Sequence, residues 1–208
     1  MIELSDDLIF AEGGRRVCYV HPDDPDKCVK VLSARGNPRT RRKKAVWYKK
    51  MRPLSCFDDN KGELKDFRDF ERRGEGVWEF FPRCYGMQET NRGDGIVTDL
   101  IRDEGGIISI TVKQYLKAQG QTPELLTALD RFFDLMMNYR IITRDILHHN
   151  LVIQRRDNGV RIVMIDGFGS SEMIPFSSWI QSVARKKVAR KIARFKTRYG
   201  FSSGEVLV

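Results

Sequence analysis

The sequence lacks the features that mark membrane-spanning and secreted chains. No run approaches the roughly 18 apolar residues that a membrane-spanning helix needs. The first residues, Met1–Asp7, are acidic and do not resemble a secretory signal peptide. We therefore expect a cytoplasmic protein, with a peripheral position at the inner membrane as the alternative.

Cysteine is also scarce, which argues against a disulfide framework or a zinc site. The four cysteines form no CxxC pair and are Cys18, Cys28, Cys56 and Cys84. Reduced thiols are the expected state in a cytoplasmic protein. His148 and His149 are adjacent, and adjacent side chains rarely point at one ion. We expect structural or substrate-edge roles for this pair.

Acidic residues are outnumbered, and this imbalance bears on the partners of the chain. The 208 residues include 37 Lys and Arg against 28 Asp and Glu, a formal charge of +9. Such a charge favours a polyanionic partner: a nucleotide, a nucleic acid, a phospholipid or a lipopolysaccharide. The hydrophobic content of 41% is enough for a core, in one large domain or two small lobes.

Two segments carry much of the positive charge, and both have helical patterns. They are residues 39–52 and 178–199. Each could leave its basic side in water, bind an anionic partner or lie on a membrane surface. Specific nucleic-acid binding is not expected, because aromatic residues are not interleaved with the basic runs in a stacking pattern and no recognition motif occurs.

The first half of the chain predicts a small antiparallel sheet. Turn residues such as Gly13-Gly14 and Pro22–Pro25 separate apolar runs. The predicted strands are 8–10, 17–20, 28–32, 83–90 and 95–101, and helices are expected at 39–52 and 63–72. These elements define a first domain over residues 1–102.

The second half, residues 103–208, is predicted to be mainly helical. Arg102–Gly106 is typical of a linker or hinge. Helices are predicted at 111–118 and 123–139, the second with one broad apolar face. A strand hairpin is predicted at 151–165. The fold class expected for the whole chain is α+β.

The segment around this hairpin contains the residue types that phosphoryl transfer requires. Asp145 and Asn150 lie just after the long helix, and Asp166 lies at the end of the second hairpin strand. A hairpin would bring Asn150 and Asp166 to neighbouring strand ends, within reach of one ion. An acid that accepts a proton, together with an amide and a second acid that hold Mg²⁺, suits a phosphoryl-transfer site.

Lys30 is a lone charge in an apolar strand, and two interpretations are open. An edge-strand lysine could extend to solvent along its neighbours. Alternatively, Lys30 could point inward and hold phosphates. Gly13 and Gly14, one strand earlier, favour the second interpretation because glycine lets backbone amides approach a phosphate.

Taken together, these residues resemble the protein-kinase-like superfamily. Lys30, the Arg-Asp-x4-Asn of 144–150 and the Asp-Gly-Phe-Gly of 166–169 match its order and spacing. A closer resemblance is carried by the segments 18–22, 28–31, 81–86, 109–111 and 174–175. In these segments the chain resembles the bacterial PhoP regulatory network protein YrbL family. The resemblance implies a two-lobed fold with a sheet-based N-terminal lobe and a truncated helical C-terminal lobe.

The resemblance also implies roles for individual residues, with ATP and Mg²⁺ as cofactors. Asp145 would accept the proton of a substrate hydroxyl. Asn150 and Asp166 would bind Mg²⁺ and, through it, the nucleotide. The remaining nucleotide contacts would come from Lys30 on the α- and β-phosphates, Gly13 and Gly14 over the phosphates, and a hinge at 98–102, including Asp99 and Leu100, at the adenine.

Several positions depart from the kinase pattern and shape the expected function. Thr143 replaces a histidine and Leu147 replaces the lysine of Ser/Thr protein kinases. The segment 39–52 offers Lys44 where an acid should pair with Lys30, so Glu63 or Glu71 would have to substitute. About forty residues follow Asp166, too few for a peptide-binding platform of the usual kind.

We therefore expect a kinase that acts on a small molecule or on a lipid or sugar head group. The alternatives are a catalytically weak or inactive nucleotide-binding module and a basic nucleic-acid-binding protein.

Overall fold

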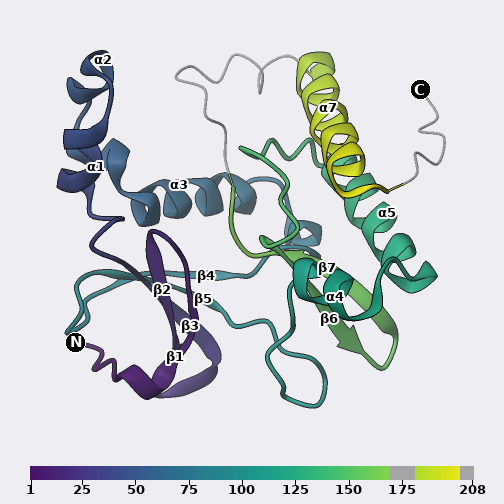
Figure 1. Ribbon diagram of the computed structural model, residues 1–208, viewed down its shortest axis with the longest axis horizontal. Coiled ribbons are helices and arrows are strands. Elements are labelled where there is room, and N and C mark those ends of the chain that lie inside the picture. Colours follow the sequence, from purple (N-terminus) through teal and green to yellow (C-terminus); the bar gives the residue numbers. More distant parts are fainter. Residues whose placement is uncertain (169–180, 202–208) are drawn as a thin grey trace. The chain divides into compact units, whose positions relative to one another are not determined.

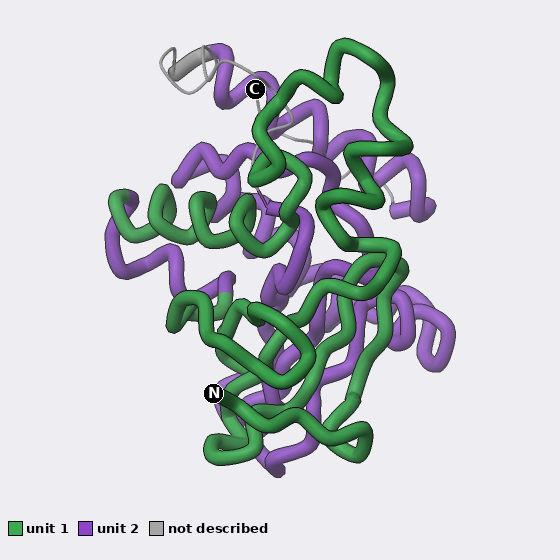
Figure 2. Tube along the Cα trace, turned by 90° about the vertical axis from the view of Figure 1, so that its left-hand side faces the viewer, with its two compact units in different colours: residues 1–72, 82–100 green, residues 73–81, 101–208 purple. Residues whose placement is uncertain are grey.

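The computed structural model describes residues 1–168 and 181–201. The chain forms two compact units, which are described separately (Figure 2). The first contains residues 1–72 and 82–100, and the second contains residues 73–81 and 101–208. The short segment 73–81 groups with the second unit because its backbone is hydrogen-bonded to residues of that unit. The Phe80 carbonyl accepts a hydrogen bond from Met164 N at 2.9 Å.

The first unit is built on a five-stranded antiparallel sheet, which confirms the predicted α+β class with the sheet at the N-terminus. The strand order is β1-β2-β3-β5-β4 (Figure 1). The strands are β1 (Ile9–Glu12), β2 (Arg16–His21), β3 (Asp24–Leu32), β4 (Cys84–Gln88) and β5 (Gly95–Asp99). A short 3-10 helix, η1 (Asp6–Leu8), precedes β1.

One core cluster of the first unit is built from residues of β2, β3 and β5. Tyr19, Val29, Val31 and Val97 are buried together with Leu4. Strand β3 pairs with β2 on one side and β5 on the other. Gly95 lies on β5 where a Cβ atom would come within 2.5 Å of Val29 Cγ1, so only glycine lets these strands approach as they do.

The basic segment 39–52 does not form the single helix that its composition predicted. It forms α1 (Pro38–Lys44) and α2 (Trp47–Lys50), which are separated by extended backbone at Ala45 and Val46. Asn37 caps α1 by accepting a hydrogen bond from Arg39 N. Neither helix has a buried residue, so burial of side chains does not favour one continuous helix over two short ones. A 3-10 helix, η2 (Leu54–Phe57), follows.

Helix α3 (Asp59–Glu71) begins earlier than predicted. The Asp58 side chain accepts hydrogen bonds from Asn60 N and Lys61 N, and these bonds satisfy two backbone donors of the first turn. The helix contacts β3, β4 and β5. Phe67 and Phe70 are buried. Glu63 lies one turn before Phe67 on the same side of α3, and it is buried against the sheet as well.

The second unit surrounds a two-stranded hairpin, β6 (Leu151–Arg156) and β7 (Gly159–Met164). The 3-10 helix η3 (Glu75–Glu79) belongs to this unit. Helix α4 (Val112–Gln119) begins with a capping box of Thr111 and Gln114, and it contacts β6. Helix α5 (Pro123–Asn138) contacts β7 through its apolar face. Its buried residues are Leu125, Ala128, Leu129, Phe132, Phe133 and Met136.

The last helix, α7 (Gln181–Tyr199), packs against α5. Val188, Ile192 and Phe195 are buried, and the rings of Phe133 and Phe195 lie 5.5 Å apart. Most of its Lys and Arg residues stay at the surface. The interpretation in which the apolar side packs and the basic side meets solvent is therefore confirmed. Residues 178–180 of the predicted helix lie outside the described residues.

The segment 102–106 forms a turn in the second unit, and hydrogen bonds hold this turn to neighbouring residues. The Asp103 side chain accepts hydrogen bonds from Ser109 Oγ at 2.6 Å and from Arg155 N at 3.0 Å. Glu104 N donates to the Arg155 carbonyl. These contacts fasten the turn to β6. Among the described residues, no helix combines the length and apolar character needed to cross a membrane.

Candidate functional site

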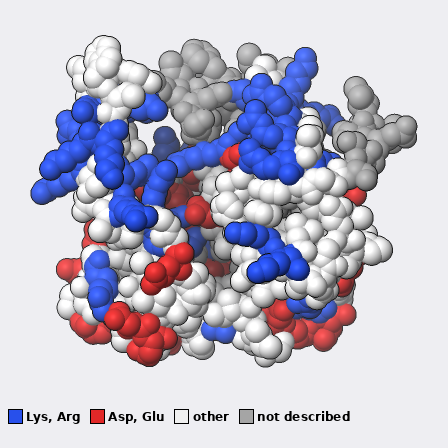
Figure 3. All heavy atoms as spheres, in the orientation of Figure 1, with Lys and Arg blue, Asp and Glu red and all other residues white. Residues whose placement is uncertain are grey.

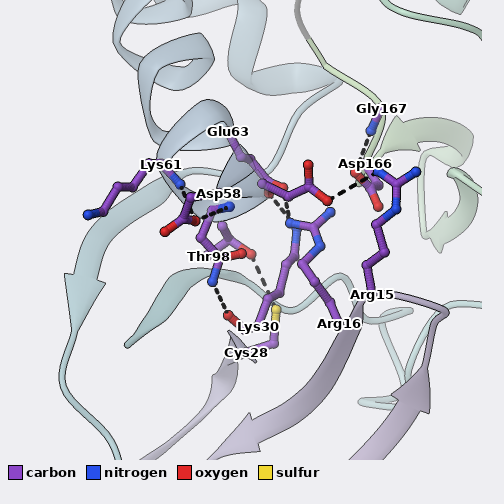
Figure 4. A network of polar contacts seen from close by, with 12 residues as sticks. Arg15, Arg16, Cys28, Lys30, Asp58, Lys61, Glu63, Thr98, Asp166 and Gly167 are labelled. Carbon is purple, nitrogen blue, oxygen red and sulfur yellow. Dashed lines mark hydrogen bonds and ion pairs between the residues drawn. The ribbon is translucent and has the colours of Figure 1, made fainter. Parts of the chain in front are cut away.

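Lys30 forms a buried ion pair with Glu63. The Lys30 Nζ and Glu63 Oε1 atoms are 2.7 Å apart, and the whole Lys30 residue is only 6% exposed (Figure 4). Because β3 is an interior strand of the sheet, the edge-strand interpretation of Lys30 is wrong. Of the two acids that could substitute for the missing partner, the structure selects Glu63, and Glu71 at the end of α3 is exposed.

A second cation shares the same carboxylate. Arg16, at the start of β2, contacts Glu63 Oε2 through Nη1, and its side chain is also nearly buried. Asn60, one turn before Glu63 on α3, donates a hydrogen bond to the Lys30 carbonyl at 2.9 Å. Three elements, β2, β3 and α3, therefore fix the position of the Lys30 ammonium group (Figure 4). Sequence analysis did not identify Arg16, because nothing in its spacing distinguishes it from Arg15.

Gly13 and Gly14 form the turn between β1 and β2. Gly13 N donates a hydrogen bond to the Arg16 carbonyl at 2.8 Å. A Cβ atom at Gly14 would meet no atom within 4 Å, so space beside the backbone is open there. The turn precedes the strand that carries Arg16. Its role over nucleotide phosphates stays a prediction.

Asp99 and Leu100, the predicted adenine contacts, already make several hydrogen bonds within the first unit. The Asp99 carboxylate accepts hydrogen bonds from Arg83 N and from the Tyr85 hydroxyl, each at 2.8 Å. The two backbone N–H groups donate to the carbonyls of Arg83 and Asp26. Adenine recognition through these N–H groups would require an exchange of partners, and it stays a prediction.

Asn150 and Asp166 lie at the same end of the β6–β7 hairpin. Leu151 is paired with Met164, and the Asn150 carbonyl accepts a hydrogen bond from Ile165 N at 2.8 Å. Asn150 therefore immediately precedes one strand, and Asp166 follows closely after the other. The hairpin register brings the two predicted magnesium ligands together, as the sequence pattern indicated.

Gly167 permits this arrangement. Its φ angle is +83°, and a Cβ atom there would lie 2.6 Å from Asn150 Nδ2. The Gly167 carbonyl accepts a hydrogen bond from Arg144 N, and Gly167 N donates to Asp166 Oδ1. A side chain at this position would be strained and would displace Asn150. Gly169 of the same motif lies outside the described residues.

The few donor atoms at the hairpin end suit Mg²⁺, and they do not suit a metal ion whose ligands all come from the protein. Magnesium is commonly bound by one or two carboxylates while waters and substrate phosphates complete its coordination. Asp166 would supply one carboxylate, and Asn150 an amide oxygen. Within residues 1–168 and 181–201, no group of three or more His, Cys, Asp or Glu residues could hold a metal ion.

Asp145, the predicted base, is ion-paired with a residue of the last helix. Arg198 Nη1 lies 2.9 Å from Asp145 Oδ2, and both side chains remain partly exposed. Hydrogen bonding to Asp145 raises the pKa of the Arg198 guanidinium. Sequence analysis missed Arg198, because 53 residues separate it from Asp145 and it is one of many basic residues on α7.

Helix α7 makes two further contacts with the loop 143–150. The ring of Tyr199 stacks on that of His148, with centroids 4.1 Å apart and planes 19° from parallel. Lys191 Nζ donates a hydrogen bond to the Arg144 carbonyl. Burial lowers the pKa values of both Lys191 and His148. The loop is thus held by α7 as well as by the hairpin.

The two positions that depart from the kinase pattern have distinct environments. Thr143 is buried in a β-bridge with Phe168, and its hydroxyl has no hydrogen-bond partner among the described residues. The Leu147 carbonyl accepts a hydrogen bond from Asn150 N at 2.8 Å, so this residue helps to close the loop. Leu147 carries no charge, and the cation that contacts Asp145 is Arg198.

Comparison with known proteins identifies relatives over nearly the whole chain. The family model described as PhoP regulatory network protein YrbL matches residues 2–200. The YrbL proteins of Escherichia coli (strain K12) and Shigella flexneri are each 29% identical over 202 residues, covering 94% of this chain and 86% of theirs.

Similar solved structures include mutants of the Mycobacterium tuberculosis PknI kinase domain. One has a TM-score of 0.45 and 18% identity, covering 90% of this chain and 71% of that chain. Another has a TM-score of 0.47 and 16% identity, covering 90% and 70%. Together with the match over residues 2–200, the 29% identity to both bacterial proteins shows that the chain belongs to the PhoP regulatory network protein YrbL family.

Proposed function

We propose that the chain is an ATP- and Mg²⁺-dependent phosphotransferase acting on a small molecule or on a lipid or sugar head group. The observation that carries the proposal is the buried Lys30–Glu63 pair. A lysine that is desolvated, paired with an acid and fixed by three elements is suited to orient phosphates, and a purely structural strand position does not need one. In the second unit, Asn150 and Asp166 lie at one end of the β6–β7 hairpin and are the proposed ligands of Mg²⁺.

In this proposal each residue has a limited task. Lys30 holds the α- and β-phosphates, and Asn150 and Asp166 hold Mg²⁺, which when bound would neutralise charge on the phosphates. Asp145 accepts the proton as the substrate hydroxyl oxygen bonds to the γ-phosphorus. The bond from that phosphorus to the bridging oxygen breaks, and ADP leaves. Positioning and charge neutralisation supply most of the rate enhancement in such reactions.

The environment of Asp145 favours a small acceptor. Leu147 stands where Ser/Thr protein kinases have a lysine, and Arg198 supplies a cation beside Asp145 from a different element. Arg198 would steady the carboxylate and attract an anionic acceptor. This chemistry suits a phosphorylated or otherwise acidic small molecule or head group.

The Asp145→Asn variant tests the assignment of the base. We expect phosphoryl transfer to fall at least about a hundredfold, because proton transfer to a positioned acid contributes that much or more. Mg·ATP binding, measured by thermal shift and by calorimetry, should be retained. Asp157→Asn, in the exposed β6–β7 turn, is the matched control. Unchanged turnover in Asp145→Asn would exclude Asp145 as the base.

One observation favours a second candidate, a nucleotide-binding regulatory module without turnover. Asp145 is already ion-paired with Arg198, and such a pair could keep the carboxylate from a substrate. Thermal-shift titration with Mg·ATP followed by a turnover assay over many acceptors separates the candidates. Binding with no ADP formation in wild type and in Arg198→Ala would favour the module.

A further inference from the structure

Helices α1 and α2 form a protruding segment whose apolar side chains have no core to enter. We call residues 38–54 the α1–α2 tip. Trp47 is 77% exposed and Met51 is 82% exposed, and Val46 and Tyr48 are more than half exposed. Trp47 and Tyr48 pack edge to face with ring centroids 6.1 Å apart. A cluster of large apolar side chains held in water is a common mark of an interaction surface.

The same segment is entirely free of acidic residues. No Asp or Glu occurs between Asp26 and Asp58. Seven cations of the tip form no ion pair within the described parts of the chain: Arg39, Arg42, Lys43, Lys44, Lys49, Lys50 and Arg52. In Figure 3 basic side chains gather over α1 and α2, and uncharged atoms lie at the outer end. The tip therefore combines apolar and cationic surface.

A hollow within the tip provides a place for anionic groups. It has a volume of about 530 Å³ and is lined by Arg39, Arg42, Lys43, Lys50 and Leu54. The Arg42 Nε atom donates to the Lys50 carbonyl at 2.8 Å and ties α1 to α2 across the hollow. Four cations and one apolar residue suit a phosphate group attached to an apolar body.

We propose that the α1–α2 tip docks on an anionic phospholipid surface. Trp and Tyr favour the interface between head groups and acyl chains, and each Lys or Arg near the surface adds attraction to anionic lipids. Met51 and Val46 gain from the acyl region but would gain little from a nucleic acid. A second copy of the chain is disfavoured, because the same face would bring seven cations against seven others. This inference does not depend on phosphoryl transfer.

Vesicle co-sedimentation tests the proposal. The full chain should bind vesicles of phosphatidylglycerol and phosphatidylethanolamine at least tenfold more tightly than vesicles of phosphatidylcholine. Binding should weaken with added salt. Tryptophan emission should shift to the blue on binding, and the Trp47→Phe variant should lose most of that shift.

Matched variants separate the apolar and cationic contributions. Trp47→Ser/Met51→Ser should lose at least tenfold in affinity, whereas Ile107→Ser, which replaces an apolar residue that is 72% exposed in the second unit, should not. Lys43→Glu/Lys50→Glu should lose binding more strongly than Arg185→Glu/Lys186→Glu. The second pair makes the same charge change at exposed positions of α7.

Three results would overturn the proposal. Equal binding to neutral vesicles would exclude recognition of anionic lipids. Loss of binding in the charge variants but not in Trp47→Ser/Met51→Ser, with RNA bound at least as tightly, would identify a general polyanion surface. Self-association that Trp47→Ser/Met51→Ser abolishes, without vesicle binding by wild type, would assign the tip to a second copy.

Discussion

Glu63 is a carboxylate shared by two buried cations of the first unit. Removing its charge would break its ion pairs with both Lys30 and Arg16. Removing one partner of a buried ion pair costs about 3 to 5 kcal/mol.

We therefore predict that Glu63→Gln lowers the free energy of unfolding by about 3 kcal/mol in urea titrations and weakens Mg·ATP binding. Glu71→Gln, at the exposed end of the same helix, is the control and should change stability by no more than about 0.5 kcal/mol. If the two variants were equally stable, the Lys30–Glu63 pair would not hold the unit together.

Arg198 lies on the other side of the proposed chemistry, beside the carboxylate of Asp145. We predict that Arg198→Ala leaves Mg·ATP affinity nearly unchanged and lowers turnover by roughly tenfold, because a misplaced base costs rate more than binding. Arg198→Lys should restore part of the rate. Exposed Arg194, on the same helix, gives the control variant Arg194→Ala. A rise in turnover in Arg198→Ala would instead identify the ion pair as inhibitory.

At the scale of elements, strands β2, β3 and β4 place three thiols in environments that disfavour the thiolate. Burial raises the pKa of Cys18 from 9.0 to about 11, and it raises the pKa values of Cys28 and Cys84 as well. Each folded-state pKa lies above its unfolded value. The associated stability is therefore complete below pH 9 and is lost as pH rises toward 11.

We predict that the free energy of unfolding falls between pH 9 and pH 11, with Cys18 contributing on the order of 2 kcal/mol. Cys18→Ser should flatten this part of the pH–stability curve, which chemical denaturation at several pH values would measure. Cys56 is exposed, so Cys56→Ser should leave the curve unchanged. The opposite slope would show that the thiolates are stabilised by their neighbours.

The elements differ in how far the sequence predicts them, and the reason is physical. The β strands are short apolar runs bounded by turn residues, and α5 has one broad apolar face, so their positions follow from local pattern. The segment 39–52 has no buried residue, and a uniform basic composition does not reveal the break at Ala45 and Val46. The start of α3 could have been located from Asp58, a favourable cap before a helix-forming run.

Residue pairs of the candidate site also differ in whether local sequence pattern can predict that they lie close together. Asn150 and Asp166 are joined by one hairpin, so their proximity follows from short-range pairing. Lys30 and Glu63 are separated by 33 residues, and only the packing of α3 on the sheet brings them together. The sequence could therefore restrict the partner of Lys30 to two candidates but could not choose between them.

For the whole molecule, the charge of +9 is distributed mainly over α1, α2 and α7, while the first residues and several turns are acidic. Figure 3 shows this unevenness on one face. A protein with a high net charge of one sign resists self-association, and this resistance disappears near the isoelectric point.

We predict that solubility is high at pH 7 and reaches a minimum near pH 9.5, the isoelectric point of the sequence. Light scattering across pH 7 to 10.5 would measure the change. The Lys43→Glu/Lys50→Glu variant has a formal charge lower by four, so its minimum should move to lower pH. A minimum that did not move would indicate that unfolding rather than charge limits solubility.

The contact between Arg198 and Asp145 also has a consequence for the order of synthesis. Ribosomes add about 5 to 20 residues per second, so Arg198 is made about 3 to 11 s after Asp145, from which it is 53 residues distant. During that interval the nascent loop has neither the guanidinium partner nor the stacked ring of Tyr199. A chain whose translation stops after Gly169 and before Arg198 would contain every residue of the kinase-like motif and still lack the guanidinium that pairs with its proposed base.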